Sequence, residues 1–235
     1  MVRALIFDVF GTLVDWRTGV AREVADFCKA RGLSVDGLGF AVAWRAKYQP
    51  AMAAIRSGGR GYVALDVLHR ENLDATLVEF GLEESIDAAG REDLNRAWEK
   101  LPPWPDCVAG LNALKAAYVI APCSNGSIAL MTWLAKYAGL PWDAILGAEV
   151  ARAYKPQAEV YLASAAALGL APEEVMMVAA HNGDLAAARW AGLKTAFVPR
   201  PHEHGPGQTS DLAPDADWDV IAADMCDLAR RMTLA

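Results

Sequence analysis

The chain has 235 residues, of which 54% are hydrophobic and 22% are charged, and its formal net charge is −7 at pH 7. This length allows one or two folded domains, and the composition is ordinary for a globular protein. The negative charge argues against binding to nucleic acid or to an anionic membrane, because both require a basic face. If the substrate is an anion, the cationic side chains that bind it must be concentrated at the binding site, because the protein as a whole is negatively charged.

The first predicted element is a strand at residues 4–7, a continuous apolar run that ends at Asp8 and is followed by Gly11. Such runs are typical of strands buried on both faces of a parallel sheet. Ligands bind at the carboxyl ends of the strands in open α/β sheets, so Asp8 lies where a nucleophilic carboxylate could act. Taken alone, Asp8 is read more simply as a turn or helix cap.

Between residues 16 and 100 the strand pattern disappears, and apolar residues recur with helical spacing. Helices are expected at 20–30, 40–55, 62–80 and 90–98. The proline-rich segment Leu101–Pro105 then predicts a stiff connection back to the sheet.

From residue 107 onward, apolar runs alternate with helical stretches, which indicates a doubly wound α/β sheet. Strands are expected at 118–121, 144–146, 175–178 and 195–198. Helices are expected at 107–117, 128–138, 160–168, 185–191 and 219–232. The Pro- and Gly-rich residues 199–214 predict a loop, and His202 and His204 within it lack a third nearby metal ligand. The predicted fold is α/β, with a Rossmann-like core of residues 1–15 and 101–235 and a helical cap of residues 16–100.

The early apolar run is too short for a signal peptide, and no segment approaches a membrane span. The four cysteines form no close pair and show no metal-ligand spacing, which favours reduced thiols. We therefore expect a cytoplasmic protein.

Four short segments, each after a predicted core strand, resemble the motifs of the haloacid dehalogenase superfamily. They are residues 8–13 (Asp-Val-Phe-Gly-Thr-Leu), 124–126 (Ser-Asn-Gly), 155–156 (Lys-Pro) and 181–184 (His-Asn-Gly-Asp). The resemblance covers nearly the whole chain and includes the helical insertion. It implies that Asp8 is a nucleophile.

Two residues distinguish this chain from the phosphatases of the superfamily. Those enzymes carry an acid two residues after the nucleophile, where this chain has Phe10, which cannot transfer a proton. The last motif offers one acid, Asp184, which would make a poor Mg²⁺ site. The chain resembles the L-2-haloacid dehalogenases in both of these features. It also resembles them in the spacing between Lys155 and Tyr161 and in the arginine of the inserted helices, Arg45.

This resemblance implies attack by Asp8 on a small 2-haloalkanoic acid, an aspartyl ester intermediate, and hydrolysis to a 2-hydroxy acid of inverted configuration. It implies a haloacid and a halide as the bound species, no metal, no cofactor and a possible homodimer. Two alternatives remain open: an Mg²⁺-dependent phosphatase or phosphonatase of the same superfamily, and a non-catalytic ligand-binding member.

The expected catalytic group comprises Asp8 and the four residues that support it. Lys155 would keep Asp8 ionised, and Thr12 would donate a hydrogen bond to it. His181 occupies the position at which the best-known members of the group, as the resemblance has it, carry asparagine. One interpretation is that His181 activates the hydrolytic water, and the alternative is a loop histidine held by hydrogen bonds. Asp184 would orient Lys155 or the water.

The expected substrate-binding residues surround this group. Ser124 and the backbone amides of Asn125 and Gly126 lie at a strand-to-helix junction, where a helix N-terminus would supply donors for the substrate carboxylate; the simpler alternative for Ser124 is a plain N-cap. Arg45 would meet the halide with help from Asn125, the alternative being a solvated arginine. The full set is Phe10, Arg45, Ser124, Asn125, Gly126, Tyr161 and Asn182.

Overall fold

The computed structural model describes residues 1–233, and its centre is a six-stranded sheet with the order β3-β2-β1-β4-β5-β6. All neighbouring strands are parallel. The strands are β1 (Ala4–Phe7), β2 (Val119–Ser124), β3 (Leu146–Gly147), β4 (Val175–Ala179), β5 (Lys194–Phe197) and β6 (Val220–Ile221). Because β1 is central, Asp8 at its carboxyl end lies in the middle of the edge where ligands bind in this class of fold.

Helices cover both faces of the sheet. They are α6 (Cys107–Lys115), α7 (Ile128–Ala138), α8 (Ala148–Ala151), α9 (Ala158–Ala167), η2 (Pro172–Glu174), α10 (Asn182–Trp190) and α11 (Met225–Thr233). Leu5 and Phe7 of β1 belong to the hydrophobic cluster that contains α6, α7 and α11, whereas Ala4 and Ile6 belong to the cluster of α9 and α10. Successive strand residues face opposite sides, so burial on both sides requires the unbroken apolar run that the sequence shows.

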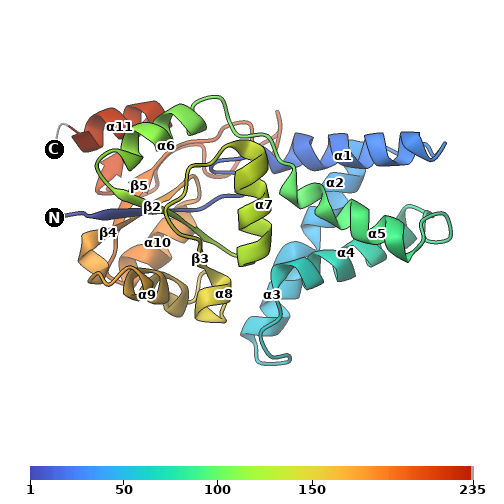
Figure 1. Ribbon diagram of the computed structural model, residues 1–235, viewed down its shortest axis with the longest axis horizontal. Helices are drawn as coiled ribbons and strands as arrows, with labels where there is room; N and C mark the ends of the chain where they lie inside the picture. The colour runs from blue at the N-terminus through green and yellow to red at the C-terminus, as the bar shows by residue number, and fades with distance from the viewer. Residues whose placement is uncertain (234–235) are drawn as a thin grey trace.

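The insertion after β1 is entirely helical. Its helices are α1 (Trp16–Ala30), α2 (Gly37–Ala46), α3 (Tyr48–Arg56), α4 (Leu65–Glu79), α5 (Ala88–Asn95) and η1 (Arg96–Glu99). Aspartates at 15, 36 and 87 begin three of them by accepting hydrogen bonds from first-turn amides. Figure 1 shows these helices grouped at one end of the sheet, beyond α7. The predicted α/β class with a helical insertion is confirmed.

Two predicted helices are wrong in detail. The helix expected at 40–55 is two helices that meet at Lys47, the residue that ends α2 and begins α3; the Lys47 N–H donates to Trp44 O, three residues back, and so leaves the regular α-helical pattern. The apolar spacing continues across this break and therefore conceals it. The helix expected at 219–232 begins only at Met225, because Val220 and Ile221 form β6. A two-residue edge strand is too short to show a recognisable pattern.

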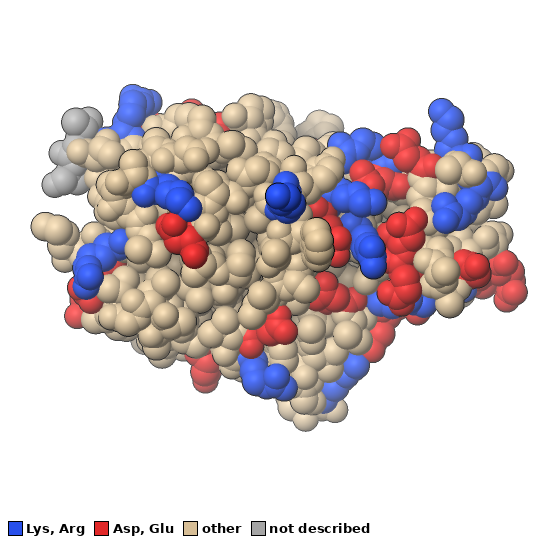
Figure 2. Space-filling view, viewed as in Figure 1, with Lys and Arg blue, Asp and Glu red and all other residues tan. Residues whose placement is uncertain are grey.

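The charged side chains and the cysteines can be located on this fold. On the face shown in Figure 2, basic side chains over the helical insertion lie beside acidic ones. All four cysteines are free, and only Cys226 among them is exposed. Within residues 1–233 no helix is both long and apolar enough to cross a membrane.

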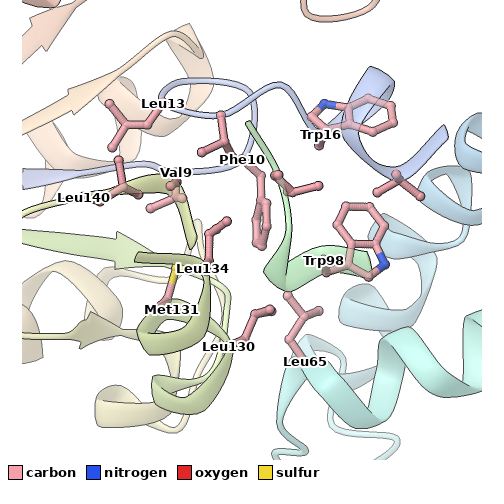
Figure 3. Close-up of a cluster of buried hydrophobic side chains, with 14 of the residues drawn as sticks. Val9, Phe10, Leu13, Trp16, Leu65, Trp98, Leu130, Met131, Leu134 and Leu140 are labelled. Atoms are coloured by element: carbon pink, nitrogen blue, oxygen red, sulfur yellow. The ribbon is translucent and has the colours of Figure 1, made fainter. Parts of the chain in front are cut away.

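Phe10 lies where the sheet domain meets the inserted helices. Figure 3 shows its ring between the α7 side chains, including Leu134, and Trp98 of η1. The rings of Phe10 and Trp98 meet edge to face, with centroids 5.8 Å apart. Through this aromatic packing, Phe10 connects the loop that contains Asp8 with the inserted helices.

Candidate active site

Asp8 is buried at the end of β1 and is held by the residues around it. Its backbone N–H donates to Val178 O at 3.0 Å, which continues the pairing with β4. The Thr12 hydroxyl donates to Asp8 Oδ2 at 2.7 Å and accepts from the Ala180 N–H at 3.0 Å. This fixes one carboxylate oxygen of Asp8, as predicted for Thr12.

Lys155 joins two buried carboxylates. Its Nζ lies 2.7 Å from Asp8 Oδ1 and 2.5 Å from Asp184 Oδ2. The Asn125 side chain positions this lysine by accepting a hydrogen bond from its backbone N–H at 2.8 Å. Burial opposes the charge on Lys155, but Asp184 and Asp8 outweigh it and raise the pKa of Lys155 above its usual range. The lysine is therefore a permanent cation beside Asp8.

Asp8 is an anion despite its burial. Desolvation alone would raise the pKa of the carboxyl group, but Lys155 and His181 outweigh it and lower the pKa well below the usual range. An ionised carboxylate that is only 7% exposed is largely shielded from solvent and is a competent nucleophile.

His181 bridges two carboxylates. Its Nδ1 lies 3.1 Å from Asp8 Oδ2 and its Nε2 lies 2.8 Å from Glu203 Oε2. Burial opposes protonation, but the hydrogen bonds that the imidazole donates to Asp8 and Glu203, together with the charges of these carboxylates, raise the pKa of His181 well above its ordinary value. In the free protein the imidazole is thus a cation at neutral pH, so it is not yet the base that the sequence interpretation required.

Glu203 is a site residue that the sequence did not reveal. It is 2% exposed and accepts a hydrogen bond from Trp16 Nε1 at 3.0 Å, in addition to its contact with His181. A Cβ at Gly11, where φ is +89°, would lie 2.0 Å from Glu203 Oε1, so only glycine fits there. The one available signal was an acid between two histidines, His202 and His204, in a loop.

Buried Arg200 anchors the loop that carries Glu203. Its Nε donates to Thr12 O at 2.8 Å, and its two terminal nitrogens bind both oxygens of Asp106 at 2.9 and 2.8 Å. Such a paired contact is geometrically specific. The segment predicted as a loop is therefore ordered at the point where it reaches the site.

A cavity of about 640 Å³ opens in front of Asp8, between the sheet and the inserted helices. Its walls are Asp8, Phe10, Arg45, Ala46, Tyr48, Gln49, Arg56, Asn125, Lys155, Pro156, His181, Gly183, Asp184, Glu203 and His204. The volume is within the range of small-molecule sites.

Arg45 reaches this cavity from α2, as predicted. Its guanidinium lies 3.9 Å from the centre of the Tyr48 ring, and within 5.3–5.9 Å of the rings of Trp16, Phe10 and Trp98. Its Nη1 is buried without a hydrogen-bond partner in the described residues. A cation with a free donor, surrounded by aromatic rings, is suited to a weakly hydrated anion.

Two predicted substrate-binding residues are buried and make hydrogen bonds within the protein. Ser124 is fully buried, and its Oγ accepts from the Gly126 N–H at 3.0 Å. Tyr161 is also buried, and its hydroxyl donates to Asp184 Oδ1 at 2.5 Å, behind the cavity wall. It therefore contacts the site through Asp184.

Asn182 corrects a prediction. Its side-chain nitrogen donates to Asp211 Oδ1 and to Ala213 O, both at 3.0 Å, and its oxygen accepts from Trp218 Nε1 at 2.9 Å. With both polar atoms used, Asn182 fixes the loop after β5 and has no free group for a substrate.

The comparisons with known proteins agree with this geometry. A model of haloacid dehalogenase-like hydrolases matches residues 2–192. An (S)-2-haloacid dehalogenase from Xanthobacter autotrophicus is 32% identical over 205 residues, which cover 85% of this chain and 76% of that protein.

Two solved structures are more similar. The crystal structure of a defluorinating L-2-haloacid dehalogenase has 55% identity and a TM-score of 0.97, and the match covers 99% of this chain and 95% of that one. A second L-2-haloacid dehalogenase has 47% identity and a TM-score of 0.96 over the full length of both chains. With motifs, fold and site geometry in agreement, the chain belongs to the haloacid dehalogenase-like hydrolase family.

Proposed function

We propose that the protein is an L-2-haloacid dehalogenase that converts a small 2-haloalkanoic acid into the 2-hydroxy acid. The observation that carries this proposal is a buried, ionised Asp8 that faces a cavity in which Arg45 has a free donor. The similar structures described as L-2-haloacid dehalogenases support it. Residues 16–100 act as the cap, since they supply Arg45, Tyr48 and Arg56 to the cavity wall.

In the first step, an Asp8 oxygen attacks C2 of the substrate from the side opposite the halogen. The new C–O bond forms as the carbon–halogen bond breaks, and the halide leaves with the bonding electron pair. Halide needs no proton, which agrees with Phe10 at the position of the phosphatase acid. Arg45 stabilises the charge that develops on the leaving group.

Ester formation changes the electrostatics around His181. It removes the Asp8 charge, one of the two that raise the pKa of His181. The imidazole then loses a proton and becomes a base held by Glu203. Water attacks the Asp8 carbonyl carbon, one water proton goes to His181, and the other goes to the departing alkoxide. The hydroxy acid forms, and the Asp8 carboxylate is restored.

His181→Gln and Glu203→Gln are expected to slow ester hydrolysis by roughly 100- to 10,000-fold, the usual range for loss of a general base. Alkylation of Asp8 still proceeds, because Lys155 keeps the carboxylate ionised. Intact-protein mass spectrometry after mixing with 2-chloropropionate should therefore show an accumulated ester. Unchanged steady-state turnover, with no ester detected, would refute this role.

The function itself is tested by halide release from chloroacetate, fluoroacetate and both enantiomers of 2-chloropropionate, with EDTA present. We expect release from the L-enantiomer and from haloacetates. Fluoroacetate is included because a structure 55% identical to this chain is described as defluorinating.

The alternative is a phosphatase of the same family. Within residues 1–233, no group of three or more His, Cys, Asp or Glu side chains is arranged to hold a metal ion, and Asp8 and Asp184 share Lys155 as their cationic partner. Mg²⁺-dependent hydrolysis of a phosphate ester, with no halide release, would favour that alternative. A thermal shift with haloacids but no turnover would favour a non-catalytic binding protein.

A further inference from the structure

The inserted helices contact the short segment of the sheet domain that carries Lys155. Arg56, the last residue of α3, donates from Nη1 to Lys155 O at 3.2 Å. In the connection that follows α3, Val63 O accepts a hydrogen bond from the Tyr154 hydroxyl at 2.7 Å. The rings of Tyr62 and Tyr154 also pack together, with centroids 5.4 Å apart. Two consecutive residues of the sheet domain, one of them Lys155, are therefore held from the inserted helices.

These contacts lie where water has little access. Tyr154 is fully buried, Lys155 is 8% exposed, and Arg56 is half-buried. Figure 1 shows α3 beside α8, the helix that precedes Tyr154 in the chain. Hydrogen bonds are electrostatically stronger in such surroundings than at the surface. The contact between Arg56 and the Lys155 carbonyl can therefore restrain the backbone at this point.

The backbone of Lys155 is held at both of its polar atoms. Its N–H donates to Asn125 Oδ1 at 2.8 Å, and its carbonyl oxygen accepts from Arg56. Asn125 follows β2 in the sheet domain, whereas Arg56 belongs to the inserted helices. A long side chain keeps an exact position only when the backbone from which it extends is fixed. The two domains thus share the task of fixing the Lys155 side chain.

The exact position of Lys155 Nζ matters because it lies between two carboxylates, 2.7 Å from Asp8 Oδ1 and 2.5 Å from Asp184 Oδ2. Displacement of the ammonium group would lengthen these contacts and weaken the support that Asp8 receives as an anion. We propose that Arg56 is a positioning residue, which keeps the Lys155 ammonium group against Asp8 by holding the Lys155 carbonyl from the inserted helices. This inference rests on the proposed dehalogenase function, and it makes the reactivity of Asp8 depend on the docking of the inserted helices.

A double-mutant cycle between Arg56 and Lys155 tests the inference through chloride release in a single turnover with saturating 2-chloropropionate. Arg56→Met should slow alkylation of Asp8 about 10- to 100-fold, as expected when a reacting group is misplaced by about 1 Å. In a Lys155→Met background the same substitution should slow it less than about 3-fold, because no ammonium group remains to be positioned. Arg56→Lys keeps a donor for the carbonyl and should remain within about 3-fold of wild type. The matched control is Arg31→Met, because Arg31 Nη1 also donates to a backbone carbonyl, Phe27 O, but within α1.

A spectroscopic measurement tests the position of Lys155 without a substrate. Burial opposes the charge on Lys155, but Asp184 and Asp8 outweigh it and keep the pKa of Lys155 above its usual range. In the full chain labelled with carbon-13 at lysine Cε, its signal should therefore titrate above the value of ordinary lysines, about 10.4. In Arg56→Met the ammonium group moves away from the carboxylates, and the signal should titrate at this ordinary value or below it. The signal that disappears in Lys155→Met identifies the residue.

Three results overturn the inference: an equal effect of Arg56→Met in both backgrounds, an unchanged titration of Lys155, or a raised KM with unchanged alkylation at saturation. The last result would mean that Arg56 only attracts the anionic substrate. Should Arg56→Met fail to fold, Arg56→Gln, whose side chain is too short for the Lys155 carbonyl, replaces it in the cycle. If Lys155→Met reacts too slowly to measure, the titration decides. Failure of the proposed function gives a different pattern, in which wild type releases no halide while the Lys155 signal still depends on Arg56.

Discussion

Asp8→Asn is expected to lower halide release by about 10,000-fold or more, because loss of a nucleophile removes the whole covalent pathway. No nearby carboxylate can replace it. Asp184 is fixed by Lys155 and Tyr161, and Glu203 is fixed by His181 and the Trp16 indole. Thr12 can still donate to an asparagine oxygen, so the variant should remain folded.

Halide release and a single turnover in oxygen-18 water measure this prediction. If Asp8 attacks carbon, the first product carries an unlabelled hydroxyl oxygen, and the label enters the Asp8 carboxylate. Asp26→Asn, a change at an exposed aspartate of α1, is the matched control and should leave the rate unchanged. Labelled product in the first turnover would mean that water attacks the substrate directly.

Lys155→Met should cost both activity and stability. The substitution leaves Asp8 and Asp184 buried without their shared cation, and loss of one partner from a buried pair typically costs about 3–5 kcal/mol. Halide release should fall by roughly 100-fold or more, since the charge that keeps Asp8 ionised is lost. Lys136→Met, at an exposed lysine of α7, is the matched control.

Urea unfolding as a function of pH separates this electrostatic loss from a packing defect. The pKa of Asp8 is lower in the folded wild type than in the unfolded chain, so its contribution is present above the unfolded value, about 3.9, and is lost as pH falls further. In Lys155→Met the buried carboxyls protonate more readily, and the stability gap to wild type should narrow towards acidic pH. A gap independent of pH would instead indicate altered packing.

The sequence predicts those parts of the fold that depend on patterns along the chain. Apolar runs locate β1, β2, β4 and β5, because strands covered on both faces leave no polar position. The spacing of apolar residues locates α7 at both ends. A break between two consecutive helices is harder to predict, as at Lys47, because the helical spacing of apolar residues continues through both helices.

Site residues that belong to a sequence motif can be predicted, whereas residues that reach the site only through tertiary contacts cannot. Asp8, Thr12 and Lys155 follow from motifs and are brought together in the structure. Glu203 belongs to no periodic element, and the contacts that place it span 22 residues to His181 and 187 to Trp16. Asn182 shows that a motif residue can also lie outside the site, because its position in the motif does not determine the direction of its side chain.

The pairing of His181 with Glu203 links two distant parts of the chain to Gly11. His181 lies within the residues matched by the family model, and Glu203 lies eleven residues after that match ends. Without His181, Glu203 would be an isolated buried charge beside the nucleophile. Gly11 must stay small, because a Cβ there would collide with Glu203. A substitution at any one of these three positions is therefore expected to disturb the group that activates water, even though residues 11 and 203 are far apart in the sequence.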